Sequence, residues 1–193
     1  MAAATAPTVL IVPGLRDHFD AHWQTLLALD LEAQRRQVKT VPPMGRNDLD
    51  CSTRVAAIER AAQAISGPIV VVAHSGGCVM VAHWARQTQR PVHAALLATP
   101  PDFEQAMPEG YPTIEALQAG GWLPVPREQL PFPSVVAASR DDPLGRYERI
   151  EELASAWGSL VVDLGLVGHL NPASGYGRWA RAESLIDRIS AGC

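Results

Sequence analysis

The sequence predicts an α/β protein with a mostly parallel sheet of about six strands and helices on both faces. Short apolar runs alternate along the chain with longer stretches of helical pattern. The runs are almost continuously apolar, which is typical of strands buried on both faces of a parallel sheet. Strands that alternate with helices form right-handed βαβ units. The 193 residues fit a single domain, residues 1–193, with no room for a large cap domain.

The elements can be placed along the chain from these patterns. Six runs are expected to be strands: 8–13, 38–41, 68–73, 91–98, 133–139 and 159–164. Helices are expected at 20–30, 52–65, 76–88, 144–157 and 178–190. The helix at 52–65 has the clearest limits, because Ser52 is a candidate N-cap and Gly67 and Pro68 end it.

The segment 99–132 interrupts the alternation of strands and helices. It is rich in proline and carries one short helical stretch around 113–119. A connection of this length in a compact domain is usually functional, so we expect a lid-like loop. Its apolar residues that could line a pocket are Met107, Tyr111, Leu117, Trp122 and Leu123. The alternative is that the segment only covers an edge of the sheet.

Composition and charge exclude several classes of protein. With 47% hydrophobic and 19% charged residues, the chain can bury a sizeable core. The net charge of −4 and the absence of a basic stripe argue against nucleic-acid binding. No apolar run approaches the ~20 residues that span a bilayer, and the first residues lack a signal-peptide pattern. Cys51, Cys78 and Cys193 show no C-x-x-C spacing. We therefore expect a cytoplasmic protein with reduced thiols and no metal or cofactor, either a monomer or a small homo-oligomer.

Ser75 lies where an expected strand gives way to an expected helix, in the stretch AHSGG. In a nucleophile elbow, usually written G-x-S-x-G, the residues two before and two after the serine must be small because they crowd each other across the turn. Ala73 and Gly77 meet this demand. The start of the helix would aim the Gly76 N–H at a developing oxyanion. Ser-Gly-Gly turns also occur in nucleotide-binding βα loops, so the motif alone leaves that alternative open.

Acidic and histidine partners for Ser75 follow later strands in the expected order, serine, then aspartate, then histidine. Asp141 and Asp142 follow the strand at 133–139, and His169 follows the strand at 159–164 after Gly168. Open α/β sheets place their sites beyond the carboxyl ends of the strands, where all these residues lie. We favour Asp142 because it immediately precedes a helix expected to begin at Pro143, and we expect Asp141 to be exposed or supporting.

The loop after the first strand, VPGLRDHFDAHW, is expected to complete the site. Gly14 permits a close approach of the backbone, Leu15 is the candidate second oxyanion donor, and Arg16 beside it is a candidate substrate-binding residue. The segment 99–132 supplies the other candidate substrate-binding residues, Met107, Tyr111, Trp122 and Leu123.

Other polar and aromatic residues are expected to be structural. His74 is next to Ser75, but its side chain is expected to point the other way, so we expect a structural role. His18 and His22 lie four residues apart near Asp17 and Asp20, but there is no H-E-x-x-H motif or third placed ligand for a metal. The residues expected in the core are Cys78, Trp23 and Trp84.

These residues together resemble the small serine hydrolases related to retinoblastoma-binding protein nine, in the α/β-hydrolase superfamily. The resemblance rests on the stretches LIVPGLRDHFDAHWQ, VVVAHSGGCVMVAHWA, LPFPSVVAASRDDP and ASAWGSLVVDLGLVGHLNPASGYGRW. It implies a compact α/β-hydrolase fold and a triad of Ser75, Asp142 and His169. The stretch GLRDHFD departs from the glycine- and serine-rich loop of many relatives.

The expected activity is hydrolysis of a small carboxylic ester through an acyl-enzyme on Ser75, or of a thioester or amide by the same chemistry. One alternative is a catalytically silent α/β-hydrolase fold that acts as a binding or scaffold protein. Another is a nucleotide-binding α/β protein, but the first strand is not followed by G-x-G-x-x-G.

Overall fold

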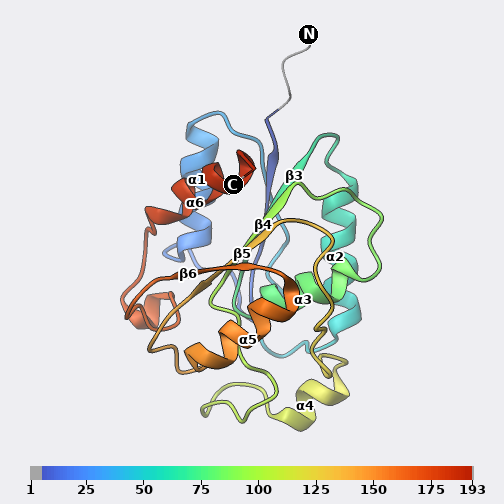
Figure 1. The fold of residues 1–193 in the computed structure, drawn as a ribbon, viewed down its shortest axis with the longest axis vertical. Coiled ribbons are helices and arrows are strands. Elements are labelled where there is room, and N and C mark those ends of the chain that lie inside the picture. Colours follow the sequence, from blue (N-terminus) through green and yellow to red (C-terminus); the bar gives the residue numbers. More distant parts are fainter. Residues whose placement is uncertain (1–5, 193) are drawn as a thin grey trace.

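The computed structural model describes residues 6–192 and contains a six-stranded parallel sheet (Figure 1). The strand order is β2-β1-β3-β4-β5-β6. Their bounds are β1 (Thr8–Val12), β2 (Val38–Thr40), β3 (Ile69–His74), β4 (Ala94–Ala98), β5 (Ser134–Ala138) and β6 (Leu160–Asp163). All neighbouring pairs are parallel, so the carboxyl ends of the strands meet at one edge of the sheet. The predicted fold class is confirmed, and each strand lies within the run expected for it except β3, which extends one residue further, to His74.

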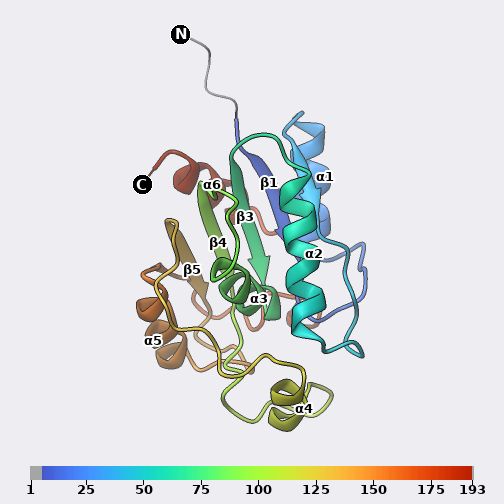
Figure 2. The ribbon, with the colours of Figure 1, turned by 90° about the vertical axis from the view of Figure 1, so that its right-hand side faces the viewer.

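Helices cover both faces of the sheet. They are α1 (Trp23–Ala33), α2 (Cys51–Gln63), α3 (Gly76–Ala85), α4 (Ile114–Ala119), α5 (Tyr147–Trp157) and α6 (Arg181–Ser190), with a short 3-10 turn at Pro172–Ser174. Helices α1 and α6 lie on one face, and α2, α3 and α5 lie on the other (Figures 1 and 2). None of the helices in the described part of the chain has the length and apolarity that crossing a membrane requires.

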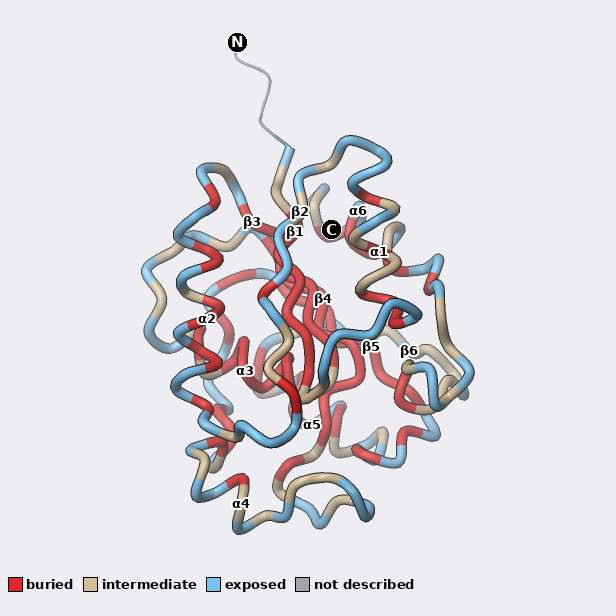
Figure 3. Tube along the Cα trace, turned by 180° about the vertical axis from the view of Figure 1, so that it is seen from behind, coloured by how far each residue is buried: buried red, intermediate tan, exposed pale blue. Residues whose placement is uncertain are grey.

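Two hydrophobic cores form because successive strand residues point to opposite faces of the sheet. In β1, Leu10 and Val12 pack toward α2 and α3, whereas Val9 and Ile11 pack toward α1 and α6. The middle strands are buried along their whole length, which explains why their sequences are continuously apolar (Figure 3). The tryptophans expected in the core, Trp23 and Trp84, are fully buried there.

Several helices begin at residues other than those expected from the sequence. The N-cap of α2 is Asp50, whose Oδ1 accepts from the Thr53 N–H at 2.6 Å. The expectation of Ser52 as N-cap was wrong, because its hydroxyl donates to Asp50 instead. Helix α5 begins at Tyr147 and not at Pro143, since the chain first makes a turn after β5.

The segment 99–132 runs past the carboxyl edge of the sheet and carries α4 (Figure 2). Most of its large apolar side chains are buried against the α2 and α3 side of the core; they are Phe103, Leu117, Trp122, Val125, Leu130 and Phe132. The segment therefore extends the hydrophobic core over this end of the sheet.

The two cysteines in the described part of the chain are free and buried, namely Cys51 and Cys78. Cys78 is packed in the core, as expected of a small hydrophobic residue, and burial raises the pKa of its thiol well above the usual value. Cys193 lies outside the described residues.

Candidate active site

Ser75 occupies the sharp turn between β3 and α3. Its backbone has φ 55° and ψ −133°, a conformation that is strained for a residue with a side chain. The side chain makes no capping hydrogen bond to α3, so Oγ is free to face other groups. This strand–turn–helix geometry matches the nucleophile elbow predicted from AHSGG.

Two glycines make the turn sterically feasible. A Cβ at Gly77 would lie only 2.6 Å from the Val12 carbonyl oxygen, and a Cβ at Gly14 would lie 2.9 Å from the Ser75 Cβ. The loop after β1 therefore packs directly against the turn that carries Ser75. Side chains at positions 14 and 77 would force these two backbones apart.

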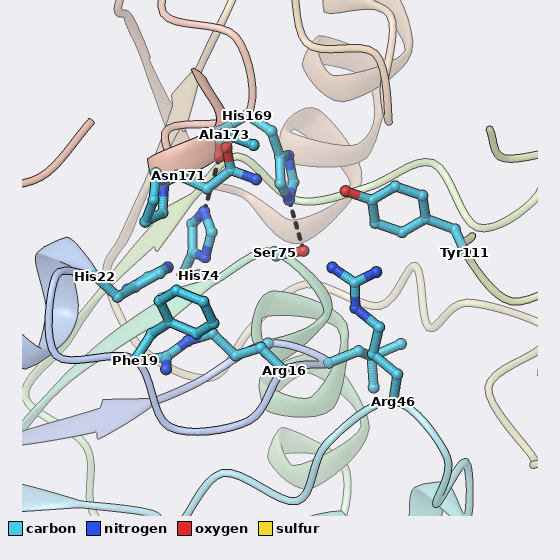
Figure 4. A pocket seen from close by; sticks show the side chains of 13 residues that line it. Arg16, Phe19, His22, Arg46, His74, Ser75, Tyr111, His169, Asn171 and Ala173 are labelled. Carbon is cyan, nitrogen blue, oxygen red and sulfur yellow. Dashed lines mark hydrogen bonds between the residues drawn. The ribbon is translucent and has the colours of Figure 1, made fainter. Parts of the chain in front are cut away.

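A continuous line of hydrogen bonds runs from Ser75 to Asp142 (Figure 4 shows its first step). The Nε2 atom of His169 lies 2.8 Å from Ser75 Oγ. The Nδ1 atom of His169 lies 2.8 Å from Asp142 Oδ2 and 3.0 Å from Oδ1. The side chains of His169 and Asp142 are almost completely buried, which strengthens their interaction. All three residues come from loops at the carboxyl ends of β3, β5 and β6.

The backbone on either side of His169 is fixed by further hydrogen bonds. Gly168 has φ +55°, and its N–H donates to Asp141 Oδ1 at 2.7 Å. The His169 N–H donates to Ser174 Oγ at 3.0 Å. A Cβ at Gly168 would lie 2.5 Å from the same Ser174 Oγ, so this position requires glycine. The loop thus presents the imidazole to Ser75 in one orientation.

The two aspartates after β5 have separate contacts. Asp142 contacts the His169 ring, although the helix that was expected to follow it at Pro143 begins only at Tyr147. Asp141 is exposed and accepts from Gly168 N–H and Ser139 Oγ, and these hydrogen bonds lower the pKa of its carboxyl group. Asp141 therefore supports the loop that carries His169.

The side chain of Leu15 lies against Gly76, the residue that follows Ser75. A Cβ at Gly76 would lie 3.2 Å from the Leu15 side chain. Gly76 is the first residue of α3, where N–H groups have no acceptor within the helix. Among the described residues, no backbone carbonyl outside the helices and strands accepts from the Leu15 or Gly76 N–H.

A pocket of about 170 Å³ opens in front of Ser75. Its walls come from the loops after β1, β2, β3 and β6 and from the segment 99–132 (Figure 4). Of the predicted substrate-binding residues, Arg16 and Tyr111 line this pocket, and so does Leu15. Phe19, Arg46 and Asn171 also line the pocket and were not predicted from the sequence. They could have been found by treating every loop after a parallel strand as part of the site.

Met107, Trp122 and Leu123 do not line the pocket, and assigning them to it was wrong. Trp122 is fully buried, stacks edge-on against Phe103 and donates its indole N–H to the Leu49 carbonyl at 2.8 Å. Met107 and Leu123 are partly buried and pack against the same core. These apolar side chains, which suggested a pocket from the sequence, instead close the hydrophobic core under the segment 99–132.

Trp122→Ala is therefore expected to destabilise the fold by about 3–5 kcal/mol, because a buried aromatic side chain is lost. The order of preference among esters of different acyl length should stay the same. Urea unfolding and rates on an ester series would measure both properties. A stable variant with an altered preference would contradict the buried position of Trp122.

His22 and His74 form a buried pair of imidazoles next to His169. The centroids of the His22 and His74 rings are 4.9 Å apart, and those of His74 and His169 are 5.0 Å apart. His74 lines the pocket floor, so the expectation that it points away from the site was wrong, although its contacts are structural. His22 caps α1 through Nδ1, which accepts the Gln24 N–H at 3.2 Å.

The hydrogen bonds of this pair define how each ring is protonated. His74 Nε2 lies 3.0 Å from the His169 carbonyl oxygen, and a carbonyl only accepts, so this nitrogen carries the proton. Because His22 Nδ1 accepts, its proton is on Nε2. Burial lowers the pKa of His22 to about 3 and that of His74 well below its usual value, with nearby Arg16 and His169 contributing. Both rings are therefore neutral and do not repel a positive charge on His169.

The neutral state of His22 should make the stability of the protein depend on pH. In the unfolded chain a histidine binds a proton below pH 6.5, whereas folded His22 does so only near pH 3. Between these values the unfolded state binds more protons, so stability falls as pH falls, by up to about 1.4 kcal/mol per pH unit. His22→Asn, which keeps an acceptor for Gln24 N–H, should lose less stability between pH 7 and 5.

Urea midpoints at the two pH values would measure this difference, with His18→Asn at an exposed position as the control. Equal slopes for the wild type and His22→Asn would contradict a neutral buried imidazole.

The histidines and aspartates after β1 do not gather at one point. His22 is buried as the cap of α1, whereas His18 is exposed and faces Asp20 at 2.9 Å. Among the described residues, no group of three or more histidine, cysteine or acidic side chains could hold a metal ion.

The parallel sheet, with a serine at the β3–α3 turn and a histidine after the last strand, defines an α/β hydrolase. Residues 9–188 match the family described as Serine hydrolase, so the chain belongs to this family. This confirms the resemblance to small serine hydrolases noted from the sequence.

Several solved structures share the fold of this chain. A protein assigned as a YdeN-like hydrolase from Pectobacterium atrosepticum has 27% identity and a TM-score of 0.75, over 95% of this chain and 90% of that chain. The ydeN gene product from B. subtilis has 15% identity and a TM-score of 0.74, over 96% and 99%. Est1E from Butyrivibrio proteoclasticus has 14% identity and a TM-score of 0.68, over 98% and 88%. No curated protein matches the chain.

Proposed function

We propose that the protein hydrolyses a small carboxylic ester through an acyl-enzyme on Ser75. The observation that carries this proposal is the line of hydrogen bonds from Ser75 Oγ through His169 to Asp142. Membership of the Serine hydrolase family supports the reaction class. A pocket of about 170 Å³ favours a substrate of few atoms.

In the proposed reaction, His169 Nε2 accepts the hydroxyl proton while Ser75 Oγ attacks the acyl carbon. The bond to the alcohol oxygen then breaks, and His169 returns the proton to the departing alcohol. A water molecule that loses its proton to His169 next attacks the acyl carbon, and His169 returns this proton to Ser75 Oγ as the bond to the acyl group breaks and the carboxylic acid leaves. Throughout, Asp142 orients His169 and stabilises its imidazolium form.

The oxyanion is proposed to accept hydrogen bonds from the N–H groups of Gly76 and Leu15. The contact of Leu15 with Gly76 and the lack of a backbone acceptor for either N–H outside the helices and strands support this role. The positive end of the α3 dipole adds to the stabilisation. Each such donor contributes about 3 kcal/mol to the transition state in hydrolases where it has been removed.

Labelling with a fluorophosphonate probe tests the proposal, because such probes react only with an activated serine. We expect one adduct, located on Ser75 by peptide mass mapping, and none on the Ser75→Ala variant. Ser52→Ala, which changes an exposed serine, is the matched control and should be labelled like the wild type. Absence of both labelling and ester turnover would support a silent fold that serves as a binding or scaffold protein.

A further inference from the structure

The pocket beside Ser75 has a positive lining in a protein whose net charge is −4. Two arginines, Arg16 and Arg46, line it. No aspartate or glutamate lines it within residues 6–192. Asp142 lies close by, but its carboxylate is engaged with His169. An anion that enters the pocket therefore meets positive charge without a competing carboxylate.

Arg46 points its guanidinium into the pocket toward Ser75 and Tyr111 (Figure 4). The guanidinium carbon lies 5.0 Å from the centre of the Tyr111 ring, and Nη1 donates to the Gly110 carbonyl at 3.3 Å. Among the described residues, no carboxylate lies within 4 Å of the Arg46 guanidinium nitrogens to form an ion pair. The remaining donors of its planar fork are free to bind a carboxylate.

The loop that carries Arg46 is held by its backbone. Gly45 N–H donates to the Arg16 carbonyl at 2.9 Å, which joins this loop to the one after β1. The buried Arg54 donates to the Gly45 carbonyl at 2.6 Å and to the Asp48 carbonyl at 2.9 Å. Asp17 lies beside Gly45, since a Cβ there would be 2.7 Å from its Oδ1. The position of Arg46 is thus set by the fold and not by a pairing acid.

Arg16 lies on the side of the pocket formed by Phe19 and His22 (Figure 4). Its Nη1 donates to the Asp17 carbonyl at 2.9 Å, and its Nε is buried and has no partner among the described residues. Burial lowers the pKa of Arg16 to about 10, which leaves it charged at neutral pH. A desolvated cation without a counterion attracts an anionic ligand strongly.

We propose that the substrate is a short ester that carries a carboxylate, which Arg46 and Arg16 bind while Ser75 attacks the ester carbonyl. This inference rests on the proposed hydrolase function and narrows its substrate class. A guanidinium fork matches the geometry of a carboxylate and forms two parallel hydrogen bonds with it. The carboxylate belongs either to the acyl part or to the alcohol part, and both arrangements leave the chemistry at Ser75 the same.

Matched pairs of esters test the proposal. Monomethyl glutarate carries the carboxylate on the acyl side, and methyl isoheptanoate has an isopropyl group in its place. O-acetylglycolate carries it on the alcohol side, with isobutyl acetate as the neutral counterpart. We expect the wild type to show at least about a tenfold higher kcat/KM for the acidic member of one pair, the scale of a hydrogen bond between charged groups. The pair that shows this preference identifies the side on which the carboxylate binds.

Substitution of the arginines should remove the preference. Arg46→Gln or Arg16→Gln should lower the acidic-to-neutral ratio at least about fivefold, and added salt should lower the wild-type ratio. Arg60→Gln, which removes an exposed charge from α2, is the control and should keep the wild-type ratio. Arg46 is exposed, so its variant reports on the pocket even where the partly buried Arg16 variant fails to fold.

Failure of this inference can be told apart from failure of the hydrolase proposal. When Ser75 is labelled by the phosphonate and neutral esters are hydrolysed, ratios near one in both pairs overturn the carboxylate substrate. A wild-type preference that neither arginine variant changes also overturns it. Absence of labelling and of all ester turnover overturns the hydrolase proposal itself.

Discussion

Ser75→Ala is expected to lower kcat for ester hydrolysis by a factor on the order of 10⁴ to 10⁶, by analogy with nucleophile removal in another serine hydrolase. The fold should remain, because Ser75 contributes little apolar packing at the turn. Steady-state rates on a short ester and circular dichroism would measure the two effects. Turnover close to that of the wild type would show that another group attacks the ester.

Comparison with Ser75→Gly separates the strain of the turn from its chemistry. Glycine adopts φ 55° without steric cost, whereas alanine keeps the strain that Ser75 bears. The strain at such a position is about 1–3 kcal/mol, and glycine in turn costs about 0.5–1 kcal/mol in chain entropy. Ser75→Gly should therefore unfold at a higher urea concentration than Ser75→Ala, with both variants inactive. The opposite order would argue against strain at the turn.

Asp142→Asn is expected to lower kcat by about 10⁴-fold, because the amide no longer holds His169 in the required tautomer. Asp141→Asn should lower kcat by no more than about tenfold, since asparagine keeps an oxygen that can accept from the Gly168 N–H. The two variants differ by one position and make the same chemical change, so each is the control for the other. A larger loss of kcat in Asp141→Asn than in Asp142→Asn would show that Asp141, and not Asp142, is the acid of the triad.

The fold and the central residues of the site could be predicted because they follow general rules of parallel sheets. Continuous apolar runs are a necessity for strands buried on both faces, and reactive residues collect where such strands end. Ser75, Asp142 and His169 follow the parallel strands β3, β5 and β6, so chain order alone brings them to one edge. The supporting argument for Asp142 was nonetheless wrong, because a turn and not a helix follows it.

The lining of the pocket could not be predicted, because composition does not distinguish a side chain that lines a cavity from one that fills a core. Trp122 and Tyr111 lie in the same segment, yet Trp122 is buried against Phe103 and Tyr111 faces the pocket. Arg46 lies 29 residues before Ser75 in the sequence, and it reaches the site through the hydrogen bond between Gly45 and Arg16. Contacts of this kind depend on loop conformation, for which the sequence has no periodic signal.

The attachment of the Arg46 loop has a consequence for how this hydrolase could diversify. Arg54 holds the loop through the carbonyl oxygens of Gly45 and Asp48, and every amino acid has such an oxygen. The exposed side chains at positions 46 and 47 could therefore be exchanged while the path of the loop stays the same. Gly14 and Gly77 allow no such exchange, because a side chain at either position collides with the neighbouring backbone or with Ser75. The proposed carboxylate contact of Arg46 can thus change by mutation while the turn that carries Ser75 stays the same.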